Sequence, residues 1–573
     1  MMLALLFVGC ISKENDPKDY REKDRKPIRI LLDSSVPEKK TDPFQCLTDW
    51  QQISWKYGNY TCFGSDIIDD NKKGILNKVL PKVVEKIQSM VSLNRNTCNH
   101  SLISVDSNKI VPPVNTFNQD LYISVFHRPL GNFKAAVGEP IGFSATDSRP
   151  IQAALYISIA GMPSDPNETA EIDLFQDILL KELIRILGFD SSVFSKWLNR
   201  ETGLPWGSAF PLTKYTNPSY PSIPFYVLHT PLAKKYASER FNRTEYAPGI
   251  PMGVELEVKS NGECDAKVNS RVYFSELLSG TQSDTYVLSD LTMTILEDMG
   301  WYSTVFSKAS PLLWGRGESL GESKMSTFPV GKPQIDFPSH YTCQPRDFNR
   351  TTTCSYDHSS LAFCWDLFVS KVHCPGAPGS DDEKFCNGQA FFNPLNLTKR
   401  GSNFNEAYTL FKSSSYQASC FKTTYEQEPY AVNLSMKFGQ DSSCIETYDV
   451  EGEQFDNFSG CYETQCDSTN TIVTVKIADK SYQCTNAGEI VSIAHPHIRS
   501  FVCPNPKIIC NSKKYRNTVF SNPERIEMPG DRFYRQKIYV ISGVGGILLL
   551  SIIGFIYYKT HMLKNEQSEY AKV

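Results

Sequence analysis

Twelve of the seventeen cysteines lie between Cys343 and Cys510, and this cluster restricts the fold more than any other feature of the chain. Such a density is typical of a disulfide framework formed in an oxidising compartment. If Cys10 is removed with a leader peptide, sixteen cysteines remain, an even number that favours complete pairing. No CxxC motif occurs, and Cys461 and Cys466 have four residues between them, so zinc binding is the weaker interpretation of these cysteines.

The two ends of the chain predict a single-pass membrane protein. Residues 1–12 hold a run of about ten apolar residues, long enough for a signal peptide and too short to span a bilayer. The alternative is an apolar start of the mature chain. Ile538–Tyr558 is 21 residues long and uncharged, which suits a transmembrane helix. We therefore expect a type I protein of the plasma membrane, with most of the chain outside the cell.

The expected topology also assigns the short tail and the glycosylation sites. Residues 559–573 form the cytoplasmic tail, where Tyr570 to Val573 resembles an endocytic sorting signal; a solvated tail is the competing interpretation. The net charge of −4 gives no electrostatic footprint for nucleic acid. Eight sequons for N-glycosylation lie on the outer side, at Asn59, Asn99, Asn167, Asn242, Asn349, Asn396, Asn433 and Asn457.

Composition and periodicity divide the remaining chain into regions. Residues 13–26 are mostly charged and polar and predict a linker or short pro-segment. Apolar residues at helical spacing predict a helix over Ile67–Val91. Strands are expected at Pro27–Leu32, Leu121–Phe126 and Ala154–Ile159. We place a first domain at 27–335, a Cys-rich, mainly β domain at 336–512 and a juxtamembrane stalk at 513–537.

The segment Glu171–Leu187 predicts the most informative helix of the chain. It has an acidic first turn, a continuous apolar stripe and Gly188 as its left-handed cap. The next residues, 189–260, are rich in Pro, Gly and aromatic residues and predict long loops. Farther along, we expect a short helix at Leu291–Leu296 and a strand at Ile472–Ile477.

This helix has the spacing of a zincin helix whose ligands are replaced. In the zincin pattern two His at i and i+4 bind zinc, and the Glu after the first His is the general base. Flanking stretches make the match specific, and over about residues 27–511 the chain resembles the leishmanolysin family of surface metalloproteases. The similar stretches are Ser148–Ile151, Val227–Pro231, Gly253–Glu257, Leu291–Tyr302, Trp314–Arg316 and Cys461–Cys466. The resemblance implies an α+β fold: a zincin-like scaffold, then a Cys-rich mainly β domain and one transmembrane helix.

The chain departs from the family at the residues that should hold zinc. Lys181 and Arg185 stand at the two helix ligand positions, while Glu182 keeps the general-base position. Charged Lys and Arg donate hydrogens and do not ligate a metal. We expect that zinc is lost, that Glu182 is vestigial, and that a salt-bridged patch replaces the metal site. Within it, Asp177 could pair with Lys181 one turn later.

The third ligand position of the family is also altered. In the family a third His precedes a Glu-Leu-Met turn; here Ser275–Leu278 resembles that turn, with Leu278 in place of Met. Residues 267–271 precede it, and which of them takes the third position stays open. No His occurs anywhere between residues 230 and 339. The resemblance therefore implies a metalloendopeptidase scaffold without its zinc ligands.

The functional prediction is a catalytically inactive pseudoprotease at the cell surface that acts in adhesion or binds an extracellular protein or peptide. One alternative is an active zinc peptidase with non-standard ligands, for which His229, His495 and His497 are the available imidazoles. Another is a structural coat glycoprotein. A serine or cysteine nucleophile is poorly supported, because no GxSxG motif occurs and the cysteines are expected to pair.

Overall fold

The computed structural model describes the chain from Arg25 to Phe520 with internal gaps. The predicted signal peptide, membrane segment and tail lie outside the described residues, as do Tyr570 and Val573. So do four sequons: Asn99, Asn349, Asn396 and Asn457. Among the described residues, no helix combines the length and apolarity needed to cross a bilayer. The described residues are 25–93, 100–105, 116–130, 134–200, 202–216, 224–259, 262–280, 286–331, 337–343, 352–363, 413–422, 426, 429–449, 458–517 and 520.

A four-stranded mixed sheet forms the centre of the N-terminal part. Its strand order is β2 (Ile30–Asp33), β8 (Leu121–His127), β10 (Pro150–Ile157) and β9 (Ala136–Phe143). The first three strands are parallel, and β9 is the antiparallel edge. Every residue of β8 and β10 is buried, as expected for strands covered on both faces. The expected strand at Ala154–Ile159 therefore begins earlier, at Pro150.

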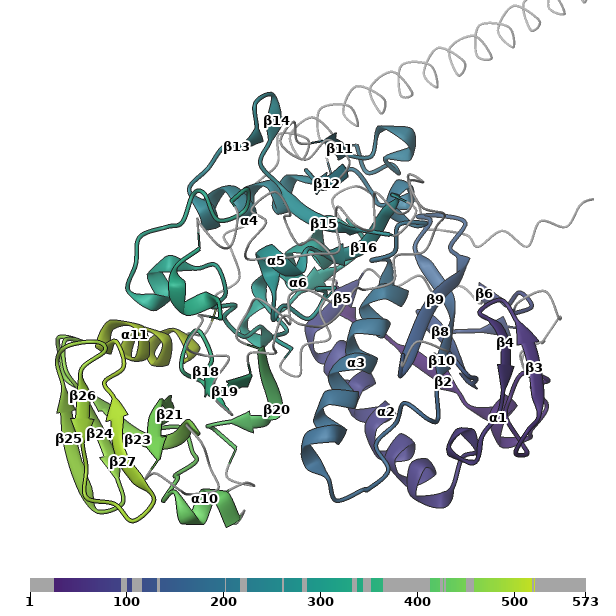
Figure 1. The fold of residues 1–573 in the computed structure, drawn as a ribbon. Helices are drawn as coiled ribbons and strands as arrows, with labels where there is room; N and C mark the ends of the chain where they lie inside the picture. Colours follow the sequence, from purple (N-terminus) through teal and green to yellow (C-terminus); the bar gives the residue numbers. More distant parts are fainter. Residues whose placement is uncertain are drawn as a thin grey trace, which may run out of the picture.

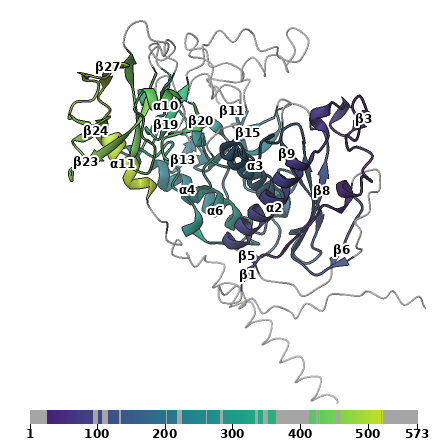
Figure 2. The ribbon, with the colours of Figure 1, turned by 90° about the horizontal axis from the view of Figure 1, so that it is seen from below.

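Two long helices, α2 (Asp70–Met90) and α3 (Thr169–Leu187), lie side by side and pack beside this sheet (Figures 1 and 2). Their apolar side chains join those of β8 and β10 in the main core. The predicted stripes are buried in both helices, and Gly188 ends α3 with a φ of +132°. A separate small core that includes Phe126 and Tyr156 lies around β8 and β10. Its neighbour is the hairpin of β3 (Gln52–Trp55) and β4 (Gly58–Thr61).

The predicted loops between 189 and 260 are the main error of the sequence-based fold. This segment contains α4 (Pro231–Phe241) and three of the four strands of an antiparallel sheet. The strands in order are β11 (Leu212–Thr216), β12 (Pro224–Leu228), β15 (Val254–Val258) and β16 (Cys264–Val268). The pattern misled because β15 buries Glu255 and Glu257, whose carboxylates bond Arg271 and Ser270 inside the protein. Two short helices follow, α5 (Ser270–Tyr273) and α6 (Asp290–Asp298).

The described C-terminal part is mainly β and is tied by disulfides, as the cysteine cluster predicts. The four disulfides resolved there join Cys354 to Cys444, Cys420 to Cys461, Cys466 to Cys510 and Cys484 to Cys503. The described strands of this part form three sheets. One contains β18 (Thr353–Cys354), β19 (Ser360–Phe363) and β20 (Ser413–Ser419), and the second contains β21 (Ser442–Ile445), β23 (Gly460–Cys466), β24 (Val473–Ile477) and β25 (Lys480–Cys484). The third contains β22 (Thr447–Asp449), β27 (Ile498–Val502) and β26 (Ile490–Ser492). Helices α10 (Pro429–Asn433) and α11 (Pro506–Arg516) accompany them.

Short elements complete the described fold. They are β1 (Lys26–Pro27), α1 (Ser35–Glu38), β5 (Val91–Leu93), β6 (His100–Ser101), β7 (Thr116–Phe117), β13 (Glu245–Ala247), β14 (Ile250–Pro251) and β17 (Ser303–Thr304). A further disulfide joins Cys46 to Cys62. The prediction that all cysteines of the mature chain pair is wrong, because Cys264 on β16 is a buried free thiol. Burial raises the pKa of this thiol to about 12, which keeps it protonated and unreactive.

Candidate functional site

The last two turns of helix α3 hold the three side chains that sequence comparison selects. Lys181 and Arg185 are four residues apart and share one face of the helix, whereas Glu182, next to Lys181, contacts a different element, strand β9. Lys181 and Glu182 are only 8% and 7% exposed. The helix ends at Gly188, where an added Cβ would lie 2.8 Å from the Trp301 ring. Packing therefore fixes both the end of the helix and the positions of these charged groups.

One oxygen of the Glu182 carboxylate accepts two hydrogen bonds. Its Oε2 accepts a hydrogen bond from the backbone N–H of Gly138 on β9, at 2.8 Å, and another from Nη1 of Arg185, at 3.1 Å. Strand and helix approach so closely here that a Cβ at residue 138 would lie 2.5 Å from the Glu182 carbonyl oxygen. Only glycine fits this crossing, and it brings an edge-strand donor within reach of the carboxylate.

Arg185 joins two carboxylates across the end of the helix. While Nη1 donates to Glu182, Nη2 donates to Oδ2 of Asp190 at 2.9 Å. Asp190 also accepts hydrogen bonds from the backbone N–H and hydroxyl of Ser192. Burial opposes ionisation of Asp190, but the bonds from Ser192 and the charge of Arg185 together hold its pKa below the ordinary value. The guanidinium is thus the centre of a compensated ion-pair network.

Lys181 does not form the expected pair with Asp177. Its Nζ donates to the carbonyl oxygen of Ser279 at 2.5 Å and lies 5.2 Å from the centre of the Tyr286 ring. Asp177 instead approaches Lys86 of α2 at 3.9 Å. The two side chains diverge because one faces the buried 276–280 turn and the other faces the neighbouring helix. Burial, together with the charge of Lys267, lowers the pKa of Lys181 to about 8.

The structure brings Lys267 to this network from strand β16. Its charge is the second cause of the lowered pKa of Lys181, after burial. Lys267 is 2.8 Å from Oδ2 of Asp265, and Asp265 in turn acts electrostatically on Arg185. Lys267 stands nine positions before Glu276, ahead of the 275–278 turn. Lys181 and Arg185 on α3 and Lys267 on β16 are called the cation triad below, because the charges of the other two both lower the pKa of Lys181.

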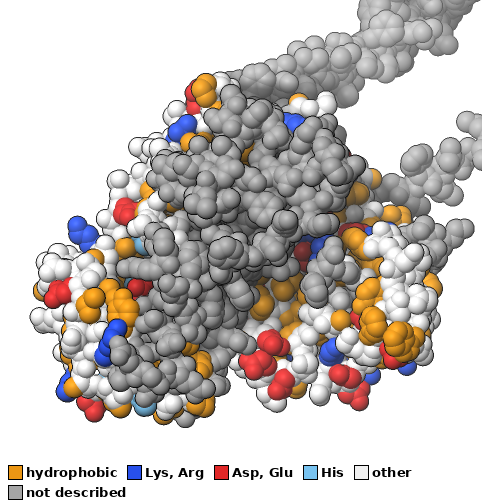
Figure 3. Space-filling view, in the orientation of Figure 1, with side chains coloured by type: hydrophobic (Ala, Val, Ile, Leu, Met, Phe, Trp, Pro, Cys, Tyr) orange, Lys and Arg blue, Asp and Glu red, His pale blue; other side chains and the backbone are white. Residues whose placement is uncertain are grey.

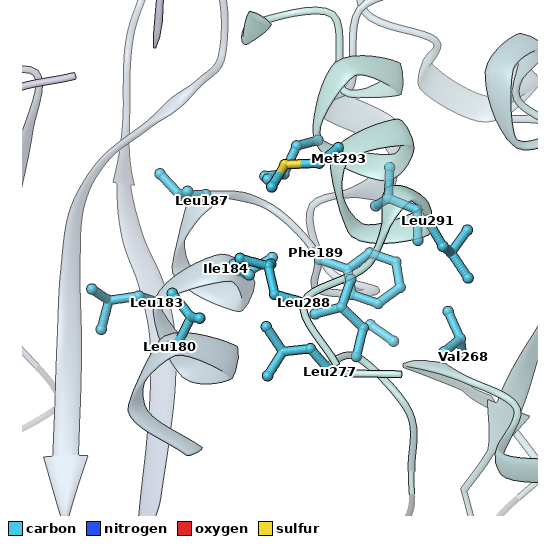
Figure 4. Packing of buried hydrophobic residues seen from close by; sticks show 14 of the residues in the cluster. Leu180, Leu183, Ile184, Leu187, Phe189, Val268, Leu277, Leu288, Leu291 and Met293 are labelled. Atoms are coloured by element: carbon cyan, nitrogen blue, oxygen red, sulfur yellow. The ribbon is translucent and has the colours of Figure 1, made fainter. Parts of the chain in front are cut away.

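The turn that follows β16 is buried beneath the cation triad. Leu278, at the expected Met position, is 1% exposed and belongs to the main core. Figure 4 shows Leu277 and Leu288 lying toward apolar side chains of α3, such as Ile184, and of α6. Glu276 is fully buried and accepts hydrogen bonds from Leu278, Ser289 and Thr292. Burial nevertheless raises its pKa to about 7.

The other candidate ligands do not join this site. His229 follows β12 and lies 3.4 Å from the carbonyl oxygen of Met252. His495 and His497 are together in the C-terminal part, where His495 bonds the hydroxyl of Ser435. Within the described part of the chain, no three His, Cys, Asp or Glu side chains are grouped so that they could hold a metal ion.

Sequence reasoning missed Gly138, Asp190 and Lys267. Asp190 had a local signal, because it comes five residues after Arg185 and two residues after the helix cap Gly188. Gly138 had no such signal, since its role depends on the approach of β9 to α3. Lys267 was one of several possible residues before the turn, and its electrostatic effect on Lys181 depends on the tertiary fold.

Comparison with known proteins shows the family of the chain. The family model for leishmanolysin, a peptidase family, matches residues 7–517, and the chain belongs to this family of metallopeptidases. It is 25% identical over 305 residues to leishmanolysin of Leishmania donovani, covering 50% of this chain and 46% of that protein.

Animal relatives show similar, low identities. A leishmanolysin-like peptidase of Drosophila melanogaster is 23% identical over 300 residues, covering 46% of this chain and 41% of that protein. A ciliated left-right organizer metallopeptidase of Mus musculus is 26% identical over 214 residues, covering 36% of this chain and 28% of that protein. The matches thus span less than half the length of these relatives.

Proposed function

We propose that this protein is a catalytically inactive leishmanolysin-family glycoprotein of the plasma membrane, which binds an extracellular protein or peptide. The observation that carries the proposal is the cation triad: Lys181 and Arg185 occupy the two helix positions that the resemblance assigns to zinc ligands, and the charge of Lys267 acts on Lys181. The names of the relatives describe peptidases, and we do not transfer that activity to this chain.

The cation triad is unsuited to zinc binding. A catalytic zinc site needs three neutral or anionic donors and an open position for water. Three side chains that carry positive charge offer no lone pair, and they repel a divalent ion at short range. Although deprotonation of Lys181 above its pKa of about 8 would free one amine, Arg185 has no neutral form in proteins. These properties support a site in which the positive charges of the side chains replace that of a metal ion.

Glu182 is also badly placed to act as a general base. In a zincin this carboxylate activates a metal-bound water. Here Oε2 is occupied by the backbone of Gly138 and by the Arg185 guanidinium. These bonds attach the helix to the edge strand and join the carboxylate to Arg185. The arrangement suits a structural tie better than a group that must exchange protons with water.

The surface location rests on the sequons and the apolar segment at residues 538–558. The four sequon asparagines that the structure describes, Asn59, Asn167, Asn242 and Asn433, are all exposed. Five disulfides among the described residues suit an oxidising compartment. Both features support a secreted or cell-surface fold, and the proposed transmembrane segment would keep it at the membrane.

The test is a measurement of zinc content and casein hydrolysis on the purified full-length chain. We expect substoichiometric zinc and no hydrolysis above a heat-denatured control. Stoichiometric zinc together with chelator-sensitive hydrolysis would show an active peptidase with other ligands and would refute the proposal. Binding of the labelled extracellular part to cells would distinguish a ligand-binding role from that of a structural coat.

A further inference from the structure

An aromatic loop stands out on the surface of the N-terminal part. Trp50 is 69% exposed and Phe63 is 46% exposed, and their rings meet edge to face with centroids 5.7 Å apart. Leu47 beside them is 37% exposed. Figure 3 shows hydrophobic side chains gathered at the right of the molecule, around the place where Figure 1 draws the β3–β4 hairpin. Large exposed aromatic side chains of this kind mark binding surfaces more often than scattered aliphatic ones do.

The loop that carries Trp50 is rigidly built. The Cys46–Cys62 disulfide closes it, and the backbones of Trp50 and Cys62 bond at 2.9 Å. The Gln51 side chain fills its centre: Oε1 accepts from the backbone N–H of Leu47 at 2.8 Å, and Nε2 donates to the carbonyl of Gln45 at 3.1 Å. A loop ordered before it meets a ligand loses little conformational entropy on binding.

Trp50 is displayed at the cost of backbone strain. Its φ is +64°, in the left-handed region that bulky side chains rarely adopt. No burial offsets this strain, because the indole is mostly in water. A strained conformation that the surrounding loop enforces, and that stability does not require, indicates a functional constraint. The constraint here is the orientation of an exposed indole beside a second aromatic ring.

The size and charge of this surface restrict its partner. A stable protein–protein interface needs about 800 Å² on each partner, from 20 or more residues, whereas the exposed apolar group here is Leu47, Trp50 and Phe63. A negatively charged lipid surface is also unsuitable. Residues 46–52 carry Asp49 and residues 63–70 carry Asp66, Asp69 and Asp70, and neither segment contains Lys or Arg.

We propose that Trp50 and Phe63 form a stacking platform for a neutral saccharide. The C–H groups on one face of a sugar ring carry partial positive charge and pack on electron-rich aromatic faces. Polar side chains beside the platform, Thr48, Asp49 and Gln52, offer hydrogen-bond partners for ring hydroxyls. The proposal concerns a part of the chain away from the cation triad and does not depend on the loss of zinc.

The test is calorimetric titration of the full-length chain with three neutral probes: chitotriose, cellotriose and mannotriose. We expect at least one to bind, and Trp50→Ala or Phe63→Ala to weaken its binding at least tenfold. Leu204→Ala is the matched control, because Leu204 is a large apolar residue that is likewise mostly exposed, at 62%, and lies elsewhere. The saccharide affinity of this variant should equal that of the unmodified chain. Binding by none of the probes, or binding unchanged in Trp50→Ala, would overturn the proposal.

A second variant separates loss of binding from loss of folding. Trp50→Gly removes the ring and relieves the positive φ, so it should abolish binding while the Tm stays equal or rises. A lowered Tm would show that the indole supports the fold and would contradict the proposal. Trp50-dependent sedimentation with phosphatidylcholine vesicles, without saccharide binding, would assign the platform to lipid instead and likewise overturn it.

Discussion

The backbone N–H of Gly138 donates a hydrogen bond to the Glu182 carboxylate across 2.8 Å, joining the edge strand β9 to helix α3. Residues 44 positions apart are thereby brought together. The same carboxylate is paired with Arg185. Hydrogen bonds and ion pairs thus join the end of α3 to the edge strand and to the segment after the helix.

Gly138→Ala should destabilise the fold by about 1–3 kcal/mol, because the added Cβ would lie 2.5 Å from the Glu182 carbonyl and 2.9 Å from Ile186. Gly74→Ala is the matched control. Gly74 lies in the exposed part of α2 with no heavy atom near its Cβ position, so alanine should stabilise the helix by about 0.5–1 kcal/mol. Urea unfolding of both variants measures the difference. Equal effects would contradict the close strand–helix contact.

Arg185→Met should destabilise the protein by about 1–3 kcal/mol, because Glu182 and Asp190 lose their shared cation while staying mostly buried. Adding Glu182→Gln and Asp190→Asn should recover part of this loss, which a multiple-mutant cycle of unfolding free energies would measure. Lys73→Met removes an exposed pair with Asp70 and should change stability by less than about 0.5 kcal/mol. Additive effects at 182, 185 and 190 would refute the network.

Restoring imidazoles at all three triad positions should create zinc affinity. Lys181→His, Arg185→His and Lys267→His together remove three cations and supply three nitrogen donors from one helix and one strand. Metal analysis after dialysis should find about one zinc per triple variant and much less in the unmodified chain. The double variant that keeps Lys267 is the control. Equal zinc in the double and triple variants would show that residue 267 does not take the third position.

Glu257→Gln should flatten the pH dependence of stability. Burial raises the pKa of Glu257 to about 7, from an ordinary value near 4.5, so the folded state binds more protons than the unfolded state between these values. Its stabilising contribution is complete below pH 4.5 and is lost as pH rises through 7, a change on the order of 3 kcal/mol. Gln keeps the acceptor for Ser270 but does not titrate.

Unfolding free energies of the unmodified chain and of Glu257→Gln at pH 5, 6, 7 and 8 measure that difference. We expect the unmodified chain to lose more stability than the variant over this range. Glu85→Gln, on the exposed face of α2, is the control and should follow the unmodified chain. A variant curve parallel to that of the unmodified chain would mean that Glu257 titrates normally.

N-glycans should be present at Asn59, Asn167, Asn242 and Asn433 when the chain is made in a eukaryotic secretory host, because all four are exposed. Enzymatic deglycosylation in heavy-oxygen water converts each occupied asparagine to a labelled aspartate that peptide mass spectrometry detects. An Asn→Gln change at each site should remove only its own label. Unlabelled peptides at all four positions would argue against passage through the secretory pathway.

Much of the fold could be predicted because its signals are local. The helices α2 and α3 follow from apolar stripes at helical spacing, and β8 from a continuous apolar run. The sheet of β11, β12, β15 and β16 could not be predicted in the same way. The segments between its strands contain several Pro and Gly residues, and β15 buries two glutamates whose partners lie on other elements.

The sequence by itself determined the family, the disulfide-rich C-terminal part and the loss of the imidazoles, because residue identity and spacing along the chain carry that information. Only the tertiary structure decided which groups meet: Gly138 with Glu182, Lys181 with Ser279 rather than Asp177, and Lys267 as the third cation. Ser279 lies 98 positions from Lys181. Contacts over such distances depend on how the elements pack, and buried charges then take the partners that packing places within reach.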